Sequence, residues 1–129
     1  MPWKLEVSGS PAIIEVIYEG VVAPTDLEAA FYAALAEGSQ RQSLLFLANL
    51  ASLTGGHSII DLMDIVSRIE AEGIDRSFRE AVLVPPGTPL GQHAEFYETA
   101  CRNRGFNARV FNDRDEAIAW LRKAVVPGP

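Results

Sequence analysis

The sequence predicts a single-domain α/β fold, a mixed β-sheet with helices packed on it, in the element order β-β-α-β-α-β-α-β-α. Short apolar runs of strand length alternate with longer segments whose apolar residues recur every three or four positions, as in amphipathic helices. The segments between the later strands are long enough for the crossovers that parallel strands require. The chain has 129 residues, the usual size of one domain.

The first elements are a hairpin, a helix and a buried strand. Residues 4–7 and 13–18 alternate or cluster β-forming residues on either side of a Gly-Ser-Pro turn, which predicts an opening hairpin. Helical periodicity follows from about residue 25 to Gly38. The continuous apolar run at 44–48 is typical of a central strand buried on both faces.

Residues 52–57 are then predicted to form a loop, and Ser58 with Asp61 to cap a second helix that runs to about Ala71. The short apolar run at 81–84 predicts the next strand.

A third helix from about Pro89 to Gly105, a strand at 108–111 and a helix at 112–121 complete the order. We expect the domain to span 1–125 and the last residues, 126–129, to form a frayed tail.

The composition predicts a folded cytoplasmic protein. The chain is 48% hydrophobic and 22% charged, which is ordinary globular usage. No apolar run approaches the roughly 20 residues of a membrane-spanning helix, and the opening residues enter a strand pattern, so we expect neither stable membrane insertion nor export. Cys101 is the one cysteine, which excludes an internal disulfide and a cysteine-based zinc site and fits a reducing compartment.

The charge of the chain is uneven. Residues 1–67 carry eight acidic and two basic side chains, whereas residues 68–129 carry nine of each, for a net charge of −6. An acidic half lacks the basic footprint that neutralises phosphates, so no nucleic-acid partner is expected. The arginines of the second half are interspersed with acids, which indicates a solvated mixed surface.

Three segments together resemble a known family: the strand-turn-helix at 19–27, the buried strand through Asn49 with its loop and helix, and residues 109–121. In this order they resemble the SpoIIAA-like branch of the STAS-like fold. The most distinctive feature is a strand ending in Val-Phe before a helix with Ala-x-x-Trp-Leu. The resemblance implies a binding or regulatory module, often self-associated, for a partner protein or an apolar small molecule such as a lipid. We therefore expect a homodimer.

STAS regulators of the anti-sigma-factor antagonist type carry a serine at the start of the helix after the central strand, and a partner kinase phosphorylates it. Their run resembles Asp-Ser-Ser-Gly, whereas this chain reads Leu-Ala-Ser-Leu-Thr-Gly-Gly-His-Ser from residue 50 to 58. Ser58 is the nearest positional match. The resemblance thus supplies an alternative function, a phospho-regulated switch at Ser58.

The loop before the second helix is a candidate anion site. It joins a buried strand to a helix N-terminus, where unpaired N–H groups and the helix dipole favour negative charge. The alternative is an ordinary capped turn, because the lysine and the spacing of a phosphate-binding P-loop are absent. The anion or phospho-site candidates are Thr54, Gly55, Gly56, His57 and Ser58.

The second helix has an apolar arc of about 220°, too wide for one sheet face to cover. Two interpretations stay open: the surplus packs on a second subunit or borders a ligand pocket, or a neighbouring helix covers it. Phe96 on the third helix is expected at its edge, near a proline-rich loop. The pocket or interface candidates are Ile60, Met63, Ile65, Phe96 and His93.

No convincing catalytic or metal-ligating set is present. His57 and His93 are the only histidines, and both follow strand ends that could face one crevice. A small hydrolase or isomerase using Ser58 and His93, with Glu95 or Asp61 as orienting acid, is a second alternative. We predict no catalytic residue, no metal and no cofactor. The leading hypothesis is a non-enzymatic STAS-like module that binds a partner protein or an apolar small molecule.

Overall fold

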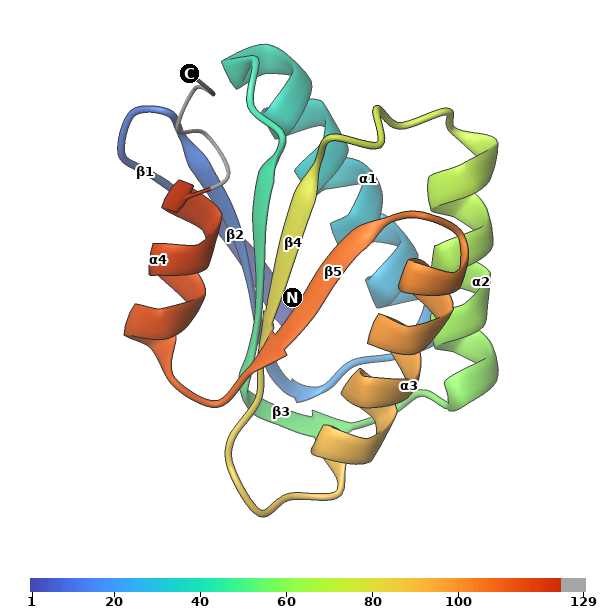
Figure 1. Ribbon diagram of the computed structural model, residues 1–129. Helices are drawn as coiled ribbons and strands as arrows, with labels where there is room; N and C mark the ends of the chain where they lie inside the picture. Colours follow the sequence, from blue (N-terminus) through green and yellow to red (C-terminus); the bar gives the residue numbers. More distant parts are fainter. Residues whose placement is uncertain (124–129) are drawn as a thin grey trace.

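The computed structural model describes residues 1–123 as a five-stranded sheet with four helices (Figure 1). The order of elements is β-β-α-β-α-β-α-β-α, so the predicted fold class is confirmed. The predicted tail, 126–129, lies outside the described residues, as does the end of the predicted domain, 124–125. The elements are β1 (Trp3–Ser8), β2 (Ile13–Val21), α1 (Pro24–Arg41), β3 (Leu45–Gly55), α2 (Ile59–Ala71), β4 (Arg79–Leu83), α3 (Leu90–Asn103), β5 (Asn107–Phe111) and α4 (Arg114–Lys123).

The strands lie in the sheet in the order in which they occur along the chain. β1 and β2 form the antiparallel hairpin, and β2 to β5 are parallel. Right-handed crossovers that always step in the same direction place their helices on the same face. Helices α1, α2 and α3 therefore cover one side, here called the three-helix face, and α4 covers the other, the α4 face (Figure 1).

Alternation along each strand divides the core in two. In β4, Glu80 and Val82 point to the three-helix face, whereas Ala81 and Leu83 point to the α4 face. Two clusters of buried residues lie beneath α1, α2 and α3, and one cluster, which includes Leu121, lies beneath α4.

β3 is longer than its apolar run predicted. The sequence predicted a strand at 44–48 and a loop at 52–57, but the strand continues to Gly55, so the loop prediction is wrong for its first four residues. Pairing with β4 ends at Asn49, whereas pairing with β2 continues to Gly55. After Asn49, β3 therefore pairs with β2 alone. Because this part of the strand is partly exposed to solvent, it can carry polar residues.

The end of α1 was also misjudged. The predicted stop was Gly38, but the helix continues to Arg41, and Gln42 adopts the left-handed conformation with φ of 53°. A Cβ atom at Gly38 would lie 2.9 Å from the Phe46 ring and 3.0 Å from the carbonyl oxygen of Ser43. This glycine therefore allows α1 to approach β3 closely, and it does not end the helix.

Helix α2 is positioned differently from the other helices. It packs mainly on α3 and α1, whereas those two helices and α4 each pack directly on strands (Figure 1). Its capping residue is Ser58, as predicted, and its buried side chains are Val66 and Ile69. Helix α2 therefore lies farther from the centre of the sheet than α1 and α3 do.

Candidate ligand-binding cavity

A cavity lies between the three-helix face of the sheet and the helices that cover it. Its volume is about 120 Å³, it opens partly to the surface, and its lining is almost entirely apolar. The lining includes Val16, Tyr18, Phe46, Ala48, Leu50, Leu53, Glu80 and Val82 from the strands, Leu27, Phe31, Ala34 and Leu35 from α1, Leu62, Ile65 and Ile69 from α2, and Leu90, His93, Ala94 and Tyr97 from α3.

The cavity exists because α2 stands off the sheet while short side chains lie opposite it. Ala34, Ala48 and Ala94 contribute to its walls from α1, β3 and α3. Native interiors are close-packed and have few voids larger than a water molecule. Ile65, one flank of the wide apolar arc of α2, faces this space and accounts for part of the surplus.

Glu80 is the carboxyl group of the lining. It lies on β4 and points to the three-helix face, where the hydroxyl of Tyr97 on α3 donates a hydrogen bond of 2.5 Å to its Oε1. Within residues 1–123 no Lys or Arg forms an ion pair with it. The remaining residues, 124–129, contain no basic side chain. Glu80 is therefore an acid in an apolar setting without a cation.

The protonation of Glu80 follows from this setting. The residue keeps some accessible surface, and it lies in the otherwise apolar lining of the cavity. Loss of hydration raises the pKa of Glu80 to about 7, although the hydrogen bond from Tyr97 acts in the opposite direction. Neutral and charged forms of this group therefore coexist at neutral pH.

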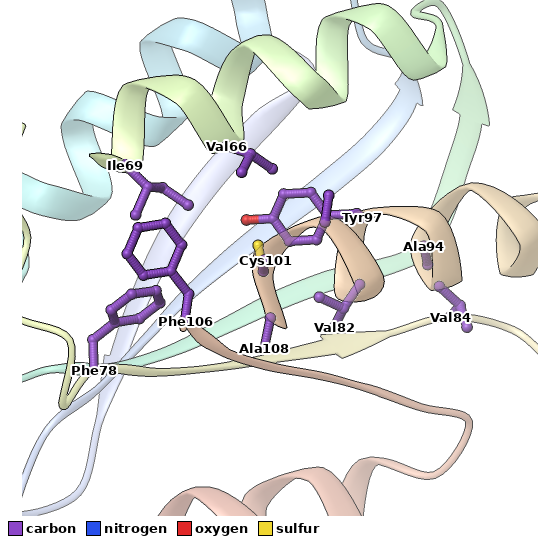
Figure 2. Packing of buried hydrophobic residues seen from close by; sticks show 11 residues of the cluster. Val66, Ile69, Phe78, Val82, Val84, Ala94, Tyr97, Cys101, Phe106 and Ala108 are labelled. Carbon is purple, nitrogen blue, oxygen red and sulfur yellow. The ribbon is translucent and has the colours of Figure 1, made fainter. Parts of the chain in front are cut away.

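The groups around Glu80 are neutral. Burial, and next the charge of Glu80, raise the pKa of both Tyr18 and Tyr97 above the ordinary phenol range. Cys101 is buried as expected, and burial raises the pKa of its thiol to about 12, so it is not a reactive thiolate. Figure 2 shows Tyr97 and Cys101 of α3 close to Val66 of α2.

Both histidines line the cavity. His57 precedes α2 and His93 lies in the first turn of α3. The Nδ1 atom of His57 lies 3.0 Å from the carbonyl oxygen of Val22, which assigns the proton of the neutral ring to Nδ1 and leaves Nε2 as an acceptor. A Cβ atom at Gly56, whose φ is +108°, would lie 2.6 Å from the same oxygen, so glycine permits this close approach.

The predicted anion site has a different geometry from the cavity. Thr54 and Gly55 end β3, and only His57 of the run lines the cavity. Ser58 caps α2: its Oγ accepts a hydrogen bond from the backbone of Asp61, and its own N–H donates to Asp61 Oδ2 at 2.7 Å. The Asp61 carboxylate therefore already supplies negative charge at this helix N-terminus. Anion binding here stays a prediction.

The apolar candidates are divided between the cavity and the surface. Ile65 and His93 line the cavity, and Met63 is partly buried against the adjacent core. Ile60 and Phe96 are 78% and 47% exposed and do not belong to the lining. An interface role for these two residues stays a prediction.

Neither a catalytic pair nor a metal cluster is assembled in the part of the chain that the structure describes. No hydrogen bond there joins Ser58 to either imidazole, because its hydroxyl contacts Asp61 at 3.1 Å. No group of three or more His, Cys, Asp and Glu side chains in residues 1–123 is placed to hold a metal ion. None of the helices in the same range combines the length and apolar character needed to cross a membrane.

Sequence reasoning missed Glu80 and the hydroxyl of Tyr97. The predicted strand began at Ala81, which left Glu80 outside it. Phe78, Glu80 and Val82 alternate with residues that point the other way, so a strict period of two would have extended the strand and exposed an acid among inward-facing apolar positions.

A buried carboxylate lies on the α4 face. Glu15 of β2 is 3% exposed, and Arg114 at the start of α4 contacts its two oxygens at 2.6 and 2.8 Å. The side-chain amide of Asn49 donates a third hydrogen bond of 2.9 Å. The hydrogen bonds from Arg114 hold the pKa of Glu15 below its ordinary value, against the effect of burial. This ion pair joins β2 to α4.

Comparison with known proteins identifies the fold. No family model and no curated protein matches the chain, but solved structures do. One, from Shewanella loihica PV-4, is described as an uncharacterized protein of the DUF3478 family with a SpoIIAA-like fold. It aligns with 92% of this chain and 91% of its own, with a TM-score of 0.59 and 17% identity.

The chain is therefore a small α/β protein with a SpoIIAA-like fold, as the resemblance of its sequence predicted. At 17% identity the likeness concerns the fold alone. A fold alone does not define a function.

Proposed function

We propose that this protein is a non-enzymatic STAS-like binding module that holds a small apolar molecule between the sheet and helices α1, α2 and α3. The observation that carries the proposal is the apolar cavity itself, about 120 Å³ in a domain of 129 residues. Ligand pockets are typically apolar with a few polar groups, and Glu80, Tyr97, His57 and His93 are the polar groups of this lining that we propose for that role.

The size of the cavity restricts the ligand. An engineered apolar cavity of roughly 150 Å³ in another protein binds benzene. At about 120 Å³ the enclosed part of the ligand is the size of one small ring, and the chain of a lipid would have to extend through the open side. We therefore propose a small molecule and not a long-chain lipid.

The two alternative functions find less support in the geometry. A phosphate on Ser58 would face the Asp61 carboxylate, whose oxygen already lies 3.1 Å from the Ser58 hydroxyl. A hydrolase would need a nucleophile in contact with a base, and Ser58 contacts Asp61 and not His93. Homodimerisation and a cytoplasmic location stay predictions.

The test is to fill the cavity. Ala48 lines its floor on β3, so we expect Ala48→Leu to reduce binding of toluene at least about tenfold, while filling the void stabilises the fold by about 0.5–2 kcal/mol. Ala119→Leu, at an exposed position on α4, is the matched control. Calorimetric titration gives the affinities, and toluene should raise the melting temperature of the wild type and of the control.

Two results would contradict the proposal. One is that the Ala48→Leu variant binds toluene as tightly as the wild type does. The other is that toluene and its polar derivatives all fail to bind the wild-type protein.

A further inference from the structure

We infer that the ligand of this cavity is a small apolar amine, bound as its ammonium ion by the carboxylate of Glu80. The inference rests on the proposed function and specifies the chemistry of the ligand. It starts from one position: Glu80 is an acid that lines an otherwise apolar cavity.

One oxygen of Glu80 is open to the ligand. Oε1 accepts the hydrogen bond from Tyr97, and no donor within residues 1–123 reaches Oε2. Every fully enclosed side-chain nitrogen or oxygen of the described residues has a hydrogen-bond partner. Oε2 has none, so it is not fully enclosed by protein, and Glu80 is one of the residues that line the cavity. A donor on the ligand would supply the hydrogen bond that Oε2 lacks.

The lining favours a cationic donor. It holds one carboxyl group, no Lys and no Arg, and it includes five aromatic rings whose faces attract cations: Tyr18, Phe31, Phe46, Phe78 and Tyr97. A charge-assisted hydrogen bond to a carboxylate is roughly twice as strong as a neutral one. The protein also carries a net charge of −6, which attracts cations from solution.

Binding of the ammonium ion is coupled to release of a proton. The ammonium enters from solvent, the carboxyl group of Glu80 gives its proton to solvent, and the bound pair is neutral overall. The other titratable groups that line the cavity or interact with Glu80 are Tyr18 from β2, Tyr97, Cys101 and His93 from α3, and His57 before α2. The phenols and the thiol stay neutral, and protonated imidazoles would repel the ligand.

The experiment compares three molecules of the same shape: benzylamine, benzyl alcohol and toluene. Calorimetric titration at pH 8 should show benzylamine binding at least about tenfold more tightly than benzyl alcohol, the difference that one pKa unit of interaction energy produces. Since the pKa of Glu80 is about 7, affinity for benzylamine at pH 5 should be about a hundredfold lower. Near pH 6, titrations in buffers of different ionisation enthalpy should report about one proton released.

Two variants identify the responsible group. In Glu80→Gln the preference for benzylamine over benzyl alcohol should disappear. Tyr97→Phe keeps the carboxyl group but removes the hydrogen bond that lowers its pKa. The pH midpoint of benzylamine binding should then move upward, which keeps the inference testable should Glu80→Gln not fold.

The outcomes separate this inference from the proposal on which it rests. If toluene and benzyl alcohol bind the wild type and benzylamine binds no better, the amine inference is overturned and the apolar-ligand proposal stands. A preference for benzylamine that persists in Glu80→Gln, or a midpoint unchanged in Tyr97→Phe, also overturns it. If none of the three binds, both fail.

Discussion

Each face of the sheet carries one inward-pointing glutamate, but the surroundings of the two glutamates are opposite. Glu15 on the α4 face has a guanidinium on both oxygens and an amide beside it, and its pKa is held below the ordinary value. Glu80 on the three-helix face has one phenol and a cavity, and its pKa is raised to about 7.

The difference separates a structural carboxylate from a candidate binding group. Both oxygens of Glu15 have hydrogen-bond donors within the chain, from Arg114 and Asn49. Glu80 lacks a cation, and burying an acid without one opposes folding whenever the acid is ionised. A group that costs stability and faces open space is a stronger functional candidate than one that is already paired.

The largest expected effect comes from breaking the paired site. Arg114→Ala would leave Glu15 charged, buried and without its cation, which should lower the free energy of unfolding by about 3–5 kcal/mol. Urea denaturation at pH 7 measures it. The control is Arg109→Ala, an exposed arginine that stacks on Phe111 and should change stability by no more than about 1 kcal/mol. A loss below about 1 kcal/mol for Arg114→Ala would mean that the ion pair does not hold α4 in place.

A smaller effect of opposite origin is expected from Glu80. Its pKa in the folded protein lies above its ordinary value of 4.5, so the folded state binds more protons, and the contribution of Glu80 to stability falls as pH rises from about 4.5 to 7. The free energy of unfolding of Glu80→Gln, taken relative to that of the wild type, should therefore rise by about 2–3 kcal/mol between pH 5 and pH 8. Denaturant unfolding at both values tests this. A constant difference would show that Glu80 titrates normally and is hydrated.

The smallest effect is expected from Tyr97→Phe, which removes one neutral donor from the unpaired acid. The loss in free energy of unfolding should be about 1.5 kcal/mol at pH 8, where the phenol bonds a carboxylate, and about half of that at pH 5. The same unfolding measurements report it. An equal loss at both pH values would contradict a direct contact between this phenol and the ionised form of Glu80.

The sequence predicted the fold well because the fold depends on patterns that are local. Strand and helix periodicities, the Ser58 cap and the apolar run at 44–48 each report on a few neighbouring residues. The errors occur where distant residues decide the structure. β3 continues because β2 accompanies it to Gly55, and α1 passes Gly38 because Phe46 needs that space.

The cavity was accessible to sequence reasoning only in part. The wide apolar arc of α2 indicated surplus apolar surface and led to Ile65, which lines the cavity, as does His93, a separate candidate on α3. The same arc gave no means of telling these positions from Ile60, which faces solvent. The partnership of Glu80 with Tyr97, 17 residues later, depends on how α3 lies across the sheet, which no local pattern encodes.

The sequential strand order has a consequence for how such a protein can change its ligand. In many open α/β sheets the strand order reverses, and ligands bind in the crevice that this reversal opens at the carboxyl edge. Here the parallel strands β2 to β5 advance in one direction, so no reversal opens a crevice among them, and the space lies between layers. Since the main backbone contacts of α2 are with α1 and α3, substitutions along its inner side would reshape the cavity without altering any backbone pairing in the sheet. Ligand specificity in this architecture can thus change through substitutions in one helix while the sheet stays the same.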